Sequence, residues 1–169
     1  MPAPDVPTRP STRDGRTRTR AAVTGAVVGG LLLLAAVEPL EVVSDSMDPT
    51  LNPGDHVVVE KLSVRWRTPE VGDLVVFRVP QGRELVVKRV VALGGQTVGL
   101  EDAVLVVDGK ARHEPQVDLT RIDSTYFGPV TVPPGAVFVL GDNRAESIDS
   151  RTYGAIPYGE LIGTVLLTF

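Results

Sequence analysis

Residues 85–93 read Leu85-Val86-Val87-Lys88-Arg89-Val90-Val91-Ala92-Leu93, an apolar run interrupted only by two adjacent cations. Its many β-branched side chains predict a strand. Because successive side chains of a strand point to opposite faces, Lys88 shares a face with Val86 and Val90. Arg89 lies on the other face. The run therefore predicts a strand that can turn its lysine towards an apolar interior and leaves Arg89 to find a carboxylate or solvent.

Similar apolar runs recur along the chain between segments rich in Gly, Pro and Asp. They are residues 56–61, 74–79, 85–93, 103–108, 136–140 and 161–169. Asp108-Gly109 stands between Val106-Val107 and Lys110-Ala111 and is typical of a two-residue hairpin. Residues 111–130 are polar and irregular, and they predict a loop or a small insertion. No amphipathic helix of any length is indicated after residue 40, so we expect a mainly β domain.

The composition excludes several classes of function. The 169 residues include no cysteine, so disulfides, thiolate catalysis and cysteine-based zinc sites are ruled out. The first 20 residues carry five arginines and two aspartates, a net charge of +3, so the rest of the chain accounts for −7 of the total of −4. An acidic domain of this kind argues against nucleic-acid binding.

The amino-terminal part divides into a basic tail and an apolar segment. Residues 1–20 are rich in Pro, Arg, Thr and Ser, which predicts a disordered tail. Residues 21–37 carry no charge and would span roughly 26 Å as a helix, at the short end for a bilayer. They are either a retained anchor with a cytoplasmic amino terminus or a cleaved signal peptide. The anchor is favoured, because the ending Leu34-Ala35-Ala36-Val37 places a large side chain at −3 or −1 of each candidate cleavage point.

A candidate nucleophile, Ser46, follows the apolar segment in the turn-forming sequence Val43-Ser44-Asp45-Ser46-Met47-Asp48-Pro49. A serine hydroxyl needs a base within hydrogen-bond reach. His56 and His113 have no nucleophile signature near them and are interpreted as structural or solvent-facing. Lys88 is the alternative, since burial lowers the pKa of a lysine. From the local pattern alone, an ordinary Ser/Asp/Pro turn and a lysine that snorkels from a half-exposed strand stay open as interpretations.

Two further features fit the same chemistry. Ser44 shares a face with Ser46 on an extended backbone, so its hydroxyl and the Ser46 N–H are candidate oxyanion donors. A polar cluster after the run 136–140 reads Gly141-Asp142-Asn143-Arg144-Ala145-Glu146-Ser147-Ile148-Asp149-Ser150-Arg151. It is either a solvated loop or a set of groups that orients a base and braces the site.

Four ordered segments carry a resemblance to a known family. They are Ser44-x-Ser46-Met47-x-Pro49-Thr50-Leu51 with Gly54-Asp55, Gly72-Asp73-Leu74-Val75-Val76-Phe77, Lys88-Arg89-Val90-Val91, and Gly141-Asp142-Asn143-Arg144-x-x-Ser147-x-Asp149-Ser150-Arg151-x-x-Gly154. Behind an amino-terminal anchor, they resemble the sequence boxes of bacterial type I signal peptidases, and residues 161–165 do so too. The resemblance covers about residues 21–169.

The resemblance implies a mainly β fold, an antiparallel sheet that forms a partly open barrel, with one amino-terminal transmembrane helix. In that organisation residues 1–20 are the cytoplasmic tail, residues 21–37 are the anchor, and residues 38–169 are an extracytoplasmic catalytic domain. After the segment Lys88-Arg89-Val90-Val91, the family more usually has Pro-Gly-Asp, and this chain has Gly94-Gly95-Gln96 instead. The short segment between the last two boxes and the single anchor resemble the compact Gram-positive or actinobacterial type.

The resemblance also implies residue roles. Ser46 matches the nucleophile, Lys88 the general base, and Ser44 with the Ser46 N–H the oxyanion hole. Ser147 matches the residue that hydrogen-bonds and orients the lysine. The implied supporting groups are Asp149, Arg151, Asp142, Asn143 and Arg144, and the implied walls of the substrate pocket are Met47, Leu51, Val42, Val86 and Val87. No metal or other cofactor is implied.

The implied function is cleavage of signal peptides from exported preproteins after small P1 and P3 residues, the Ala-x-Ala pattern. The implied location is the plasma membrane, with the lipid bilayer and secretory preproteins as partners, near the Sec or Tat export machinery. Three alternatives stay open: a Ser–Lys maturation protease with a narrow client, a self-cleaving repressor type, and a catalytically silent anchored β domain that binds partners.

Overall fold

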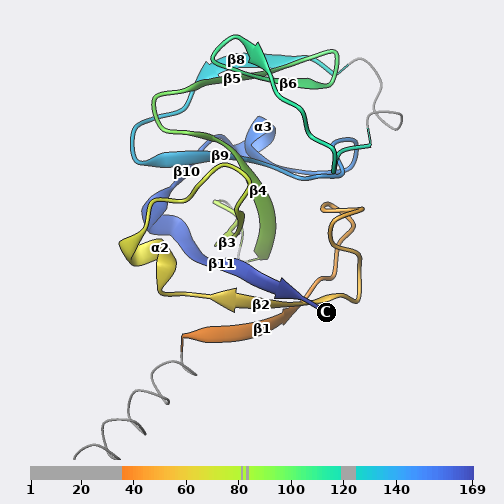
Figure 1. Ribbon diagram of the computed structural model, residues 1–169, viewed down its shortest axis with the longest axis vertical. Coiled ribbons are helices and arrows are strands. Elements are labelled where there is room, and N and C mark those ends of the chain that lie inside the picture. Colours follow the sequence, from red (N-terminus) through yellow and green to blue (C-terminus); the bar gives the residue numbers. More distant parts are fainter. Residues whose placement is uncertain (1–35, 81, 83, 119–124) are drawn as a thin grey trace, which may run out of the picture. The chain divides into compact units, whose positions relative to one another are not determined.

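Two antiparallel β-sheets form the framework of the part of the chain that the computed structural model describes, residues 36–80, 82, 84–118 and 125–169 (Figure 1). The larger sheet contains, in spatial order, β1 (Val37–Glu41), β2 (His56–Glu60), β11 (Leu161–Thr168), β3 (Leu74–Arg78), β4 (Leu85–Leu93), β9 (Ala136–Leu140) and β10 (Ile156–Pro157). This sheet is curled into a half-barrel, with β1 and β10 as its edge strands.

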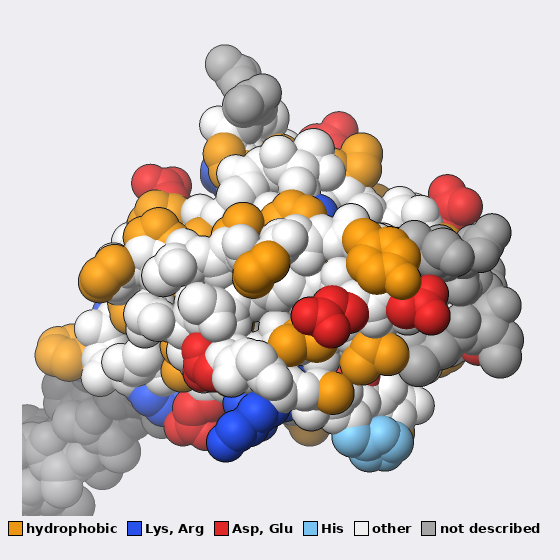
Figure 2. All heavy atoms as spheres, turned by 90° about the horizontal axis from the view of Figure 1, so that it is seen from above, with side chains coloured by type: hydrophobic (Ala, Val, Ile, Leu, Met, Phe, Trp, Pro, Cys, Tyr) orange, Lys and Arg blue, Asp and Glu red, His pale blue; other side chains and the backbone are white. Residues whose placement is uncertain are grey.

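The smaller sheet contains β7 (Lys110–Ala111), β6 (Val104–Val107), β5 (Thr97–Glu101) and β8 (Phe127–Thr131), with β7 and β8 at its edges. Three short helical turns complete the described elements: α2 (Ser63–Trp66), α3 (Ser150–Tyr153) and the 3-10 turn η2 (Tyr158–Glu160). Seen from the side of the smaller sheet, apolar side chains lie scattered among acidic ones, without a single large patch (Figure 2).

Three clusters of buried apolar side chains form the core of the described residues. One contains Val98 and Leu100 of β5 with Phe138 and Leu140 of β9, and it joins the two sheets. A second packs Val137 and Val139, which point to the opposite face of β9. Because both faces of β9 are covered, its five residues are all buried, and they read as a continuous apolar run.

The third cluster lies beneath the turn that carries Ser46. Met47 and Leu51 of that turn pack with Val57 and Val59 of β2 and with Val76 of β3. Burial of these apolar side chains fixes the turn against the larger sheet.

The sequence-based strand predictions hold for six strands, whose observed ends lie within one residue of the expected ones. The hairpin at Asp108-Gly109 is confirmed, since both residues have positive φ and β6 pairs with β7 around them. The interpretation of residues 111–130 as a loop was wrong in part, because β8 occupies Phe127–Thr131. The strands β1, β5 and β10 were also not predicted.

The predicted tail, residues 1–20, and nearly all of the predicted anchor, residues 21–37, lie outside the described residues. Val37, the last residue of the predicted anchor, is the first residue of β1. Within the described ranges, no helix has the length and apolar character needed to cross a membrane.

Candidate active site

A lysine and a serine that are 42 positions apart in the sequence meet at the edge of the third cluster. Lys88 Nζ lies 2.6 Å from Ser46 Oγ and also donates a hydrogen bond to the Val87 carbonyl at 3.2 Å. β4 positions the lysine, and the turn after β1 positions the serine. Lys88 is only 2% exposed, so its amino group lies largely out of water, while Ser46 is half-buried.

Burial lowers the pKa of Lys88 from 10.5 to about 8, while the nearby carboxylates of Asp149 and Asp142 oppose this change. The apolar setting is the one that the strand pattern predicts: Lys88 lies opposite Val75 of β3. Val90, on the same face of β4, belongs to the second apolar cluster. A lysine with this pKa loses its proton near neutral pH far more readily than an exposed lysine does.

Ser44 lies beside the candidate nucleophile. Its Oγ is 3.2 Å from Ser46 Oγ, which confirms that the two side chains share a face. The hydroxyl can therefore reach the space in front of Ser46.

The loop after β9 packs directly on the backbone of Ser46. Asn143 N donates to the Ser46 carbonyl at 3.2 Å, and Asn143 Nδ2 donates to the Asp45 carbonyl at 3.1 Å. Gly141 is needed for this close approach, because a Cβ at that position would overlap Ser147 Oγ and the Ser46 carbonyl oxygen. The polar cluster is thus part of the site and not a solvated loop.

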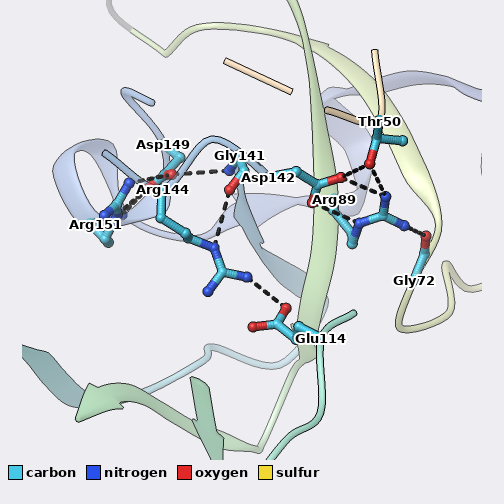
Figure 3. Close-up of polar contacts among 9 residues, drawn as sticks. All are labelled: Thr50, Gly72, Arg89, Glu114, Gly141, Asp142, Arg144, Asp149 and Arg151. Carbon is cyan, nitrogen blue, oxygen red and sulfur yellow. Dashed lines mark hydrogen bonds and ion pairs between the residues drawn. The ribbon is translucent and has the colours of Figure 1, made fainter. Parts of the chain in front are cut away.

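Asp142 receives the cation next to Lys88 in sequence. Arg89 Nε and Nη2 donate to the two carboxylate oxygens of Asp142 at 2.8 and 2.6 Å, and Thr50 Oγ1 donates to Asp142 at 2.6 Å (Figure 3). The side chain of Asp142 is 1% exposed and that of Arg89 is 17% exposed. The Arg89–Asp142 ion pair and the Thr50 hydrogen bond connect β4, the loop after β9 and the turn of Ser46. Of the two expected partners of Arg89, a carboxylate or solvent, the structure shows the carboxylate.

Asp149 and Arg151 form the predicted supporting pair. Arg151 Nε and Nη2 donate to Asp149 at 2.8 and 2.9 Å, and Asp149 also accepts from the Gly141 N–H at 3.0 Å (Figure 3). Asp149 is the N-cap of α3, accepting from the Arg151 N–H. Arg151 Nη2 in turn donates to the Ser147 carbonyl at 3.1 Å, which closes the loop on itself.

The Arg144 guanidinium is buried within the same loop. Its Nε donates to the Gly141 carbonyl at 3.1 Å, and its Nη2 donates to Glu114 Oε1 at 2.6 Å (Figure 3). Glu114 lies after β7, in the segment that the sequence indicated as an irregular loop. The segment that follows the smaller sheet's edge strand β7 therefore supplies a carboxylate to this loop.

Ser147 differs from its predicted geometry. Its Oγ is buried but has no hydrogen-bond partner among the described residues, and the two hydrogen bonds of Lys88 Nζ go to Ser46 and Val87. The predicted hydrogen bond from Ser147 to Lys88 is thus not formed in this structure, although Ser147 Oγ lies against Gly141, in the loop that packs on Ser46.

A small pocket opens in front of the two serines, with a volume of about 60 Å³. Four of the five predicted walls line it, namely Val42, Met47, Val86 and Val87. Leu51 does not line the pocket. It is fully buried in the third cluster together with Met47, and its role as a wall of the substrate pocket stays a prediction.

The two histidines are exposed, as the sequence interpretation expected. His56 contacts the ring of Phe169, with centroids 5.7 Å apart. Within the described ranges, no group of three or more His, Cys, Asp or Glu side chains is arranged to hold a metal ion.

Comparison with known proteins agrees with this geometry. Residues 16–169 match the family described as "Signal peptidase, peptidase S26". The chain belongs to this signal peptidase family. It is 41% identical over 157 residues to a probable signal peptidase I-1 of Synechocystis sp., an alignment that covers 85% of this chain and 76% of that protein. The family is that of a serine peptidase, so the chain is assigned to the hydrolases.

Two further relatives extend the comparison. Thylakoidal processing peptidase 1 of Arabidopsis thaliana is 37% identical over 156 residues, which is 85% of this chain but only 45% of that longer protein. The crystal structure of a signal peptidase I from Enterococcus faecalis V583 superposes with a TM-score of 0.53 at 29% identity, covering 60% of this chain and 98% of that one. The curled antiparallel sheet is therefore the fold of the signal peptidase family.

Sequence reasoning missed two residues of this signal peptidase site. Thr50 lies in the same segment as Ser44 and Ser46, but the sequence indicated no role for it. Its hydroxyl donates a hydrogen bond to Asp142. Glu114 neutralises Arg144 across 30 residues of sequence, and no periodicity or motif marks it. The available signal was the arginine itself, since a guanidinium that becomes buried needs a carboxylate.

Proposed function

We propose that this protein is a membrane-anchored serine endopeptidase that removes signal peptides from exported preproteins, with Ser46 as nucleophile and Lys88 as general base. The observation that carries this proposal is the 2.6 Å contact between Ser46 Oγ and the buried Lys88 Nζ, whose pKa is lowered to about 8. A serine paired with a desolvated lysine is one of the recognised ways of activating a weak nucleophile.

In the proposed reaction, neutral Lys88 accepts the proton of Ser46 Oγ as the oxygen attacks the scissile carbonyl carbon. The Ser44 hydroxyl and the Ser46 N–H donate hydrogen bonds to the oxyanion. Lys88 then returns the proton to the leaving amine, and the mature protein departs with a new amino terminus. The signal peptide remains as an ester on Ser46 until Lys88 deprotonates a water molecule that hydrolyses it.

The pocket in front of the serines supports a preference for small side chains. Its apolar walls, Val42, Met47, Val86 and Val87, leave a volume of about 60 Å³. A space of this size favours a small side chain such as that of alanine. We propose that the substrate class has small P1 and P3 residues, the Ala-x-Ala pattern.

The proposed location is the plasma membrane. Residues 21–37 form the single anchor, the basic tail remains in the cytoplasm, and residues 38–169 face the other side. The tail of five arginines supports this orientation. The proposed partners are secretory preproteins and the lipid bilayer, close to the Sec or Tat machinery from which the preproteins emerge.

The test is cleavage of a preprotein with an Ala-x-Ala site by the full chain in detergent, with Ser46→Ala, Lys88→Ala and the exposed control Lys110→Ala. We expect wild type and Lys110→Ala to cut at that site and the other two variants to lose activity by several orders of magnitude. Activity that survives Lys88→Ala would show that another group is the base. Cleavage of one preprotein in a panel of unrelated ones would favour the narrow-client protease.

A further inference from the structure

Asn143 holds both peptide groups that flank the candidate nucleophile. Its side-chain Nδ2 donates to the carbonyl of Asp45 at 3.1 Å, and its backbone N–H donates to the carbonyl of Ser46 at 3.2 Å. Asn143 is 6% exposed, so these contacts are shielded from water.

The first of these contacts acts on a specific N–H group. The Asp45 carbonyl and the Ser46 N–H belong to one planar peptide unit, in which the C=O and N–H bonds point in opposite directions. A hydrogen bond that fixes the carbonyl therefore also fixes the direction of the N–H. The same bond polarises the peptide unit and makes its N–H a stronger donor.

We infer that Asn143 is a positioning residue for the oxyanion hole, which aims the Ser46 N–H by holding the Asp45 carbonyl through its side-chain amide. This inference rests on the proposed function, in which the Ser46 N–H receives the oxyanion. Asn143 does not touch the reacting atoms; it acts through the peptide unit that joins Asp45 to Ser46.

The surrounding contacts explain why the amide can perform this task. Asp142 and Arg144, the neighbours of Asn143, are anchored by Arg89 and Glu114 respectively. The loop is thus braced on both sides of Asn143, and its amide meets the Asp45 carbonyl from a rigid support. Such bracing matters because an oxyanion donor is effective only within a narrow range of position.

The experiment compares wild type with Asn143→Asp, which keeps the size of the side chain but replaces the donor NH2 by a carboxylate. Asn143→Ala serves as the second variant if the first does not fold, and Asn52→Asp, at an exposed position, is the matched control. For each protein we measure kcat and KM on an Ala-x-Ala preprotein. We also measure the carbonyl stretch of an acyl group on Ser46 by isotope-edited infrared spectroscopy, with a ¹³C-labelled acylating probe.

We expect the Asn143 variants to lose roughly 10- to 100-fold in kcat, somewhat less than the loss of an oxyanion donor itself, with KM changed less than about twofold. The acyl carbonyl stretch should move to higher frequency, because a weaker hydrogen bond to the carbonyl oxygen strengthens the C=O bond. Asn52→Asp should match wild type in both measurements.

An unchanged kcat, or a lowered kcat with the carbonyl stretch at its wild-type frequency, would overturn the inference and leave Asn143 a purely structural residue. Failure of wild type to cleave any preprotein would count against the proposed function, while the infrared comparison would still test Asn143. A Ser46 that cannot be acylated in wild type would remove the premise and refute both.

Discussion

Glu114 Oε1 lies 2.6 Å from Arg144 Nη2, so a carboxylate after β7 neutralises a cation in the loop after β9. The side chain of Arg144 is 1% exposed and that of Glu114 is 11% exposed. Because Arg144 also donates to the Gly141 carbonyl, this pair connects the region of the smaller sheet to the loop that packs on Ser46.

Removing one member of this pair should be costly. Glu114→Ala leaves a buried guanidinium unpaired and should lower the free energy of unfolding by about 3–5 kcal/mol. The double variant Glu114→Leu/Arg144→Met should lose much less stability than Glu114→Ala, since two apolar side chains need no charged partner. Urea denaturation measures both effects, with the exposed Glu146→Ala as control. A loss below about 1 kcal/mol for Glu114→Ala would contradict the burial of the pair.

Lys88 should make stability depend on pH in the alkaline range. Its pKa is about 8 in the folded protein and 10.5 ordinarily, so between these values the unfolded chain binds a proton that the folded chain does not. Stability therefore rises with pH across this window, by roughly 3 kcal/mol in total. Lys88→Met should remove this rise, and the exposed Lys110→Met should retain it. Parallel stability curves for wild type and Lys88→Met from pH 8 to 10.5 would refute the lowered pKa.

Asp142→Asn should change the titration of Lys88. The carboxylate of Asp142 favours the ammonium form, so its neutralisation should lower the pKa of Lys88 further. The rise of cleavage activity with pH should then shift to lower pH, and the NMR titration of Lys88 Nζ should shift in the same direction. The variant should also be less stable, because the bidentate partner of Arg89 is weakened. A shift to higher pH would show that Asp142 does not act on Lys88 by its charge.

Gly141→Ala should abolish activity and strongly destabilise the protein. The added Cβ would overlap the Ser46 carbonyl oxygen and Ser147 Oγ, so the loop must move away from Ser46. Gly159→Ala is the control, because its Cβ would enter open space and the backbone there has no positive φ. Thermal unfolding and preprotein cleavage are the two measurements, and wild-type values for Gly141→Ala would mean that the loop is not packed on Ser46.

The sequence predicts the strands whose own side chains form continuous apolar runs. β9 is such a strand, because both of its faces are covered, and β4 is apolar except for Lys88 and Arg89. β5 is interrupted by Gly99 and β8 by Gly128-Pro129, yet Val98 and Leu100 are buried between the sheets. These strands exist because of their partners, and a local pattern does not contain that information.

The residues of the site also divide into those that a local sequence pattern marks and those that depend on tertiary packing. The Lys88–Ser46 hydrogen bond, the Arg89–Asp142 ion pair and the Asp149–Arg151 ion pair join residues that carry sequence signals of their own. The partnership of Glu114 with Arg144 and the burial of Leu51 below the pocket depend on long-range packing alone. Residue types and spacing therefore indicated the candidate catalytic residues. The residues that support them could be identified only from the tertiary structure.

The edge strands of the two sheets have a consequence for self-association. β1 contains Pro39, β10 contains Pro157 and β8 contains Pro129, while β7 is only two residues long. A proline has no N–H to donate, so a neighbouring extended chain cannot form an unbroken ladder on β1, β8 or β10, and β7 is too short to offer one. Within the described residues, each edge strand thus disfavours growth into a larger intermolecular sheet.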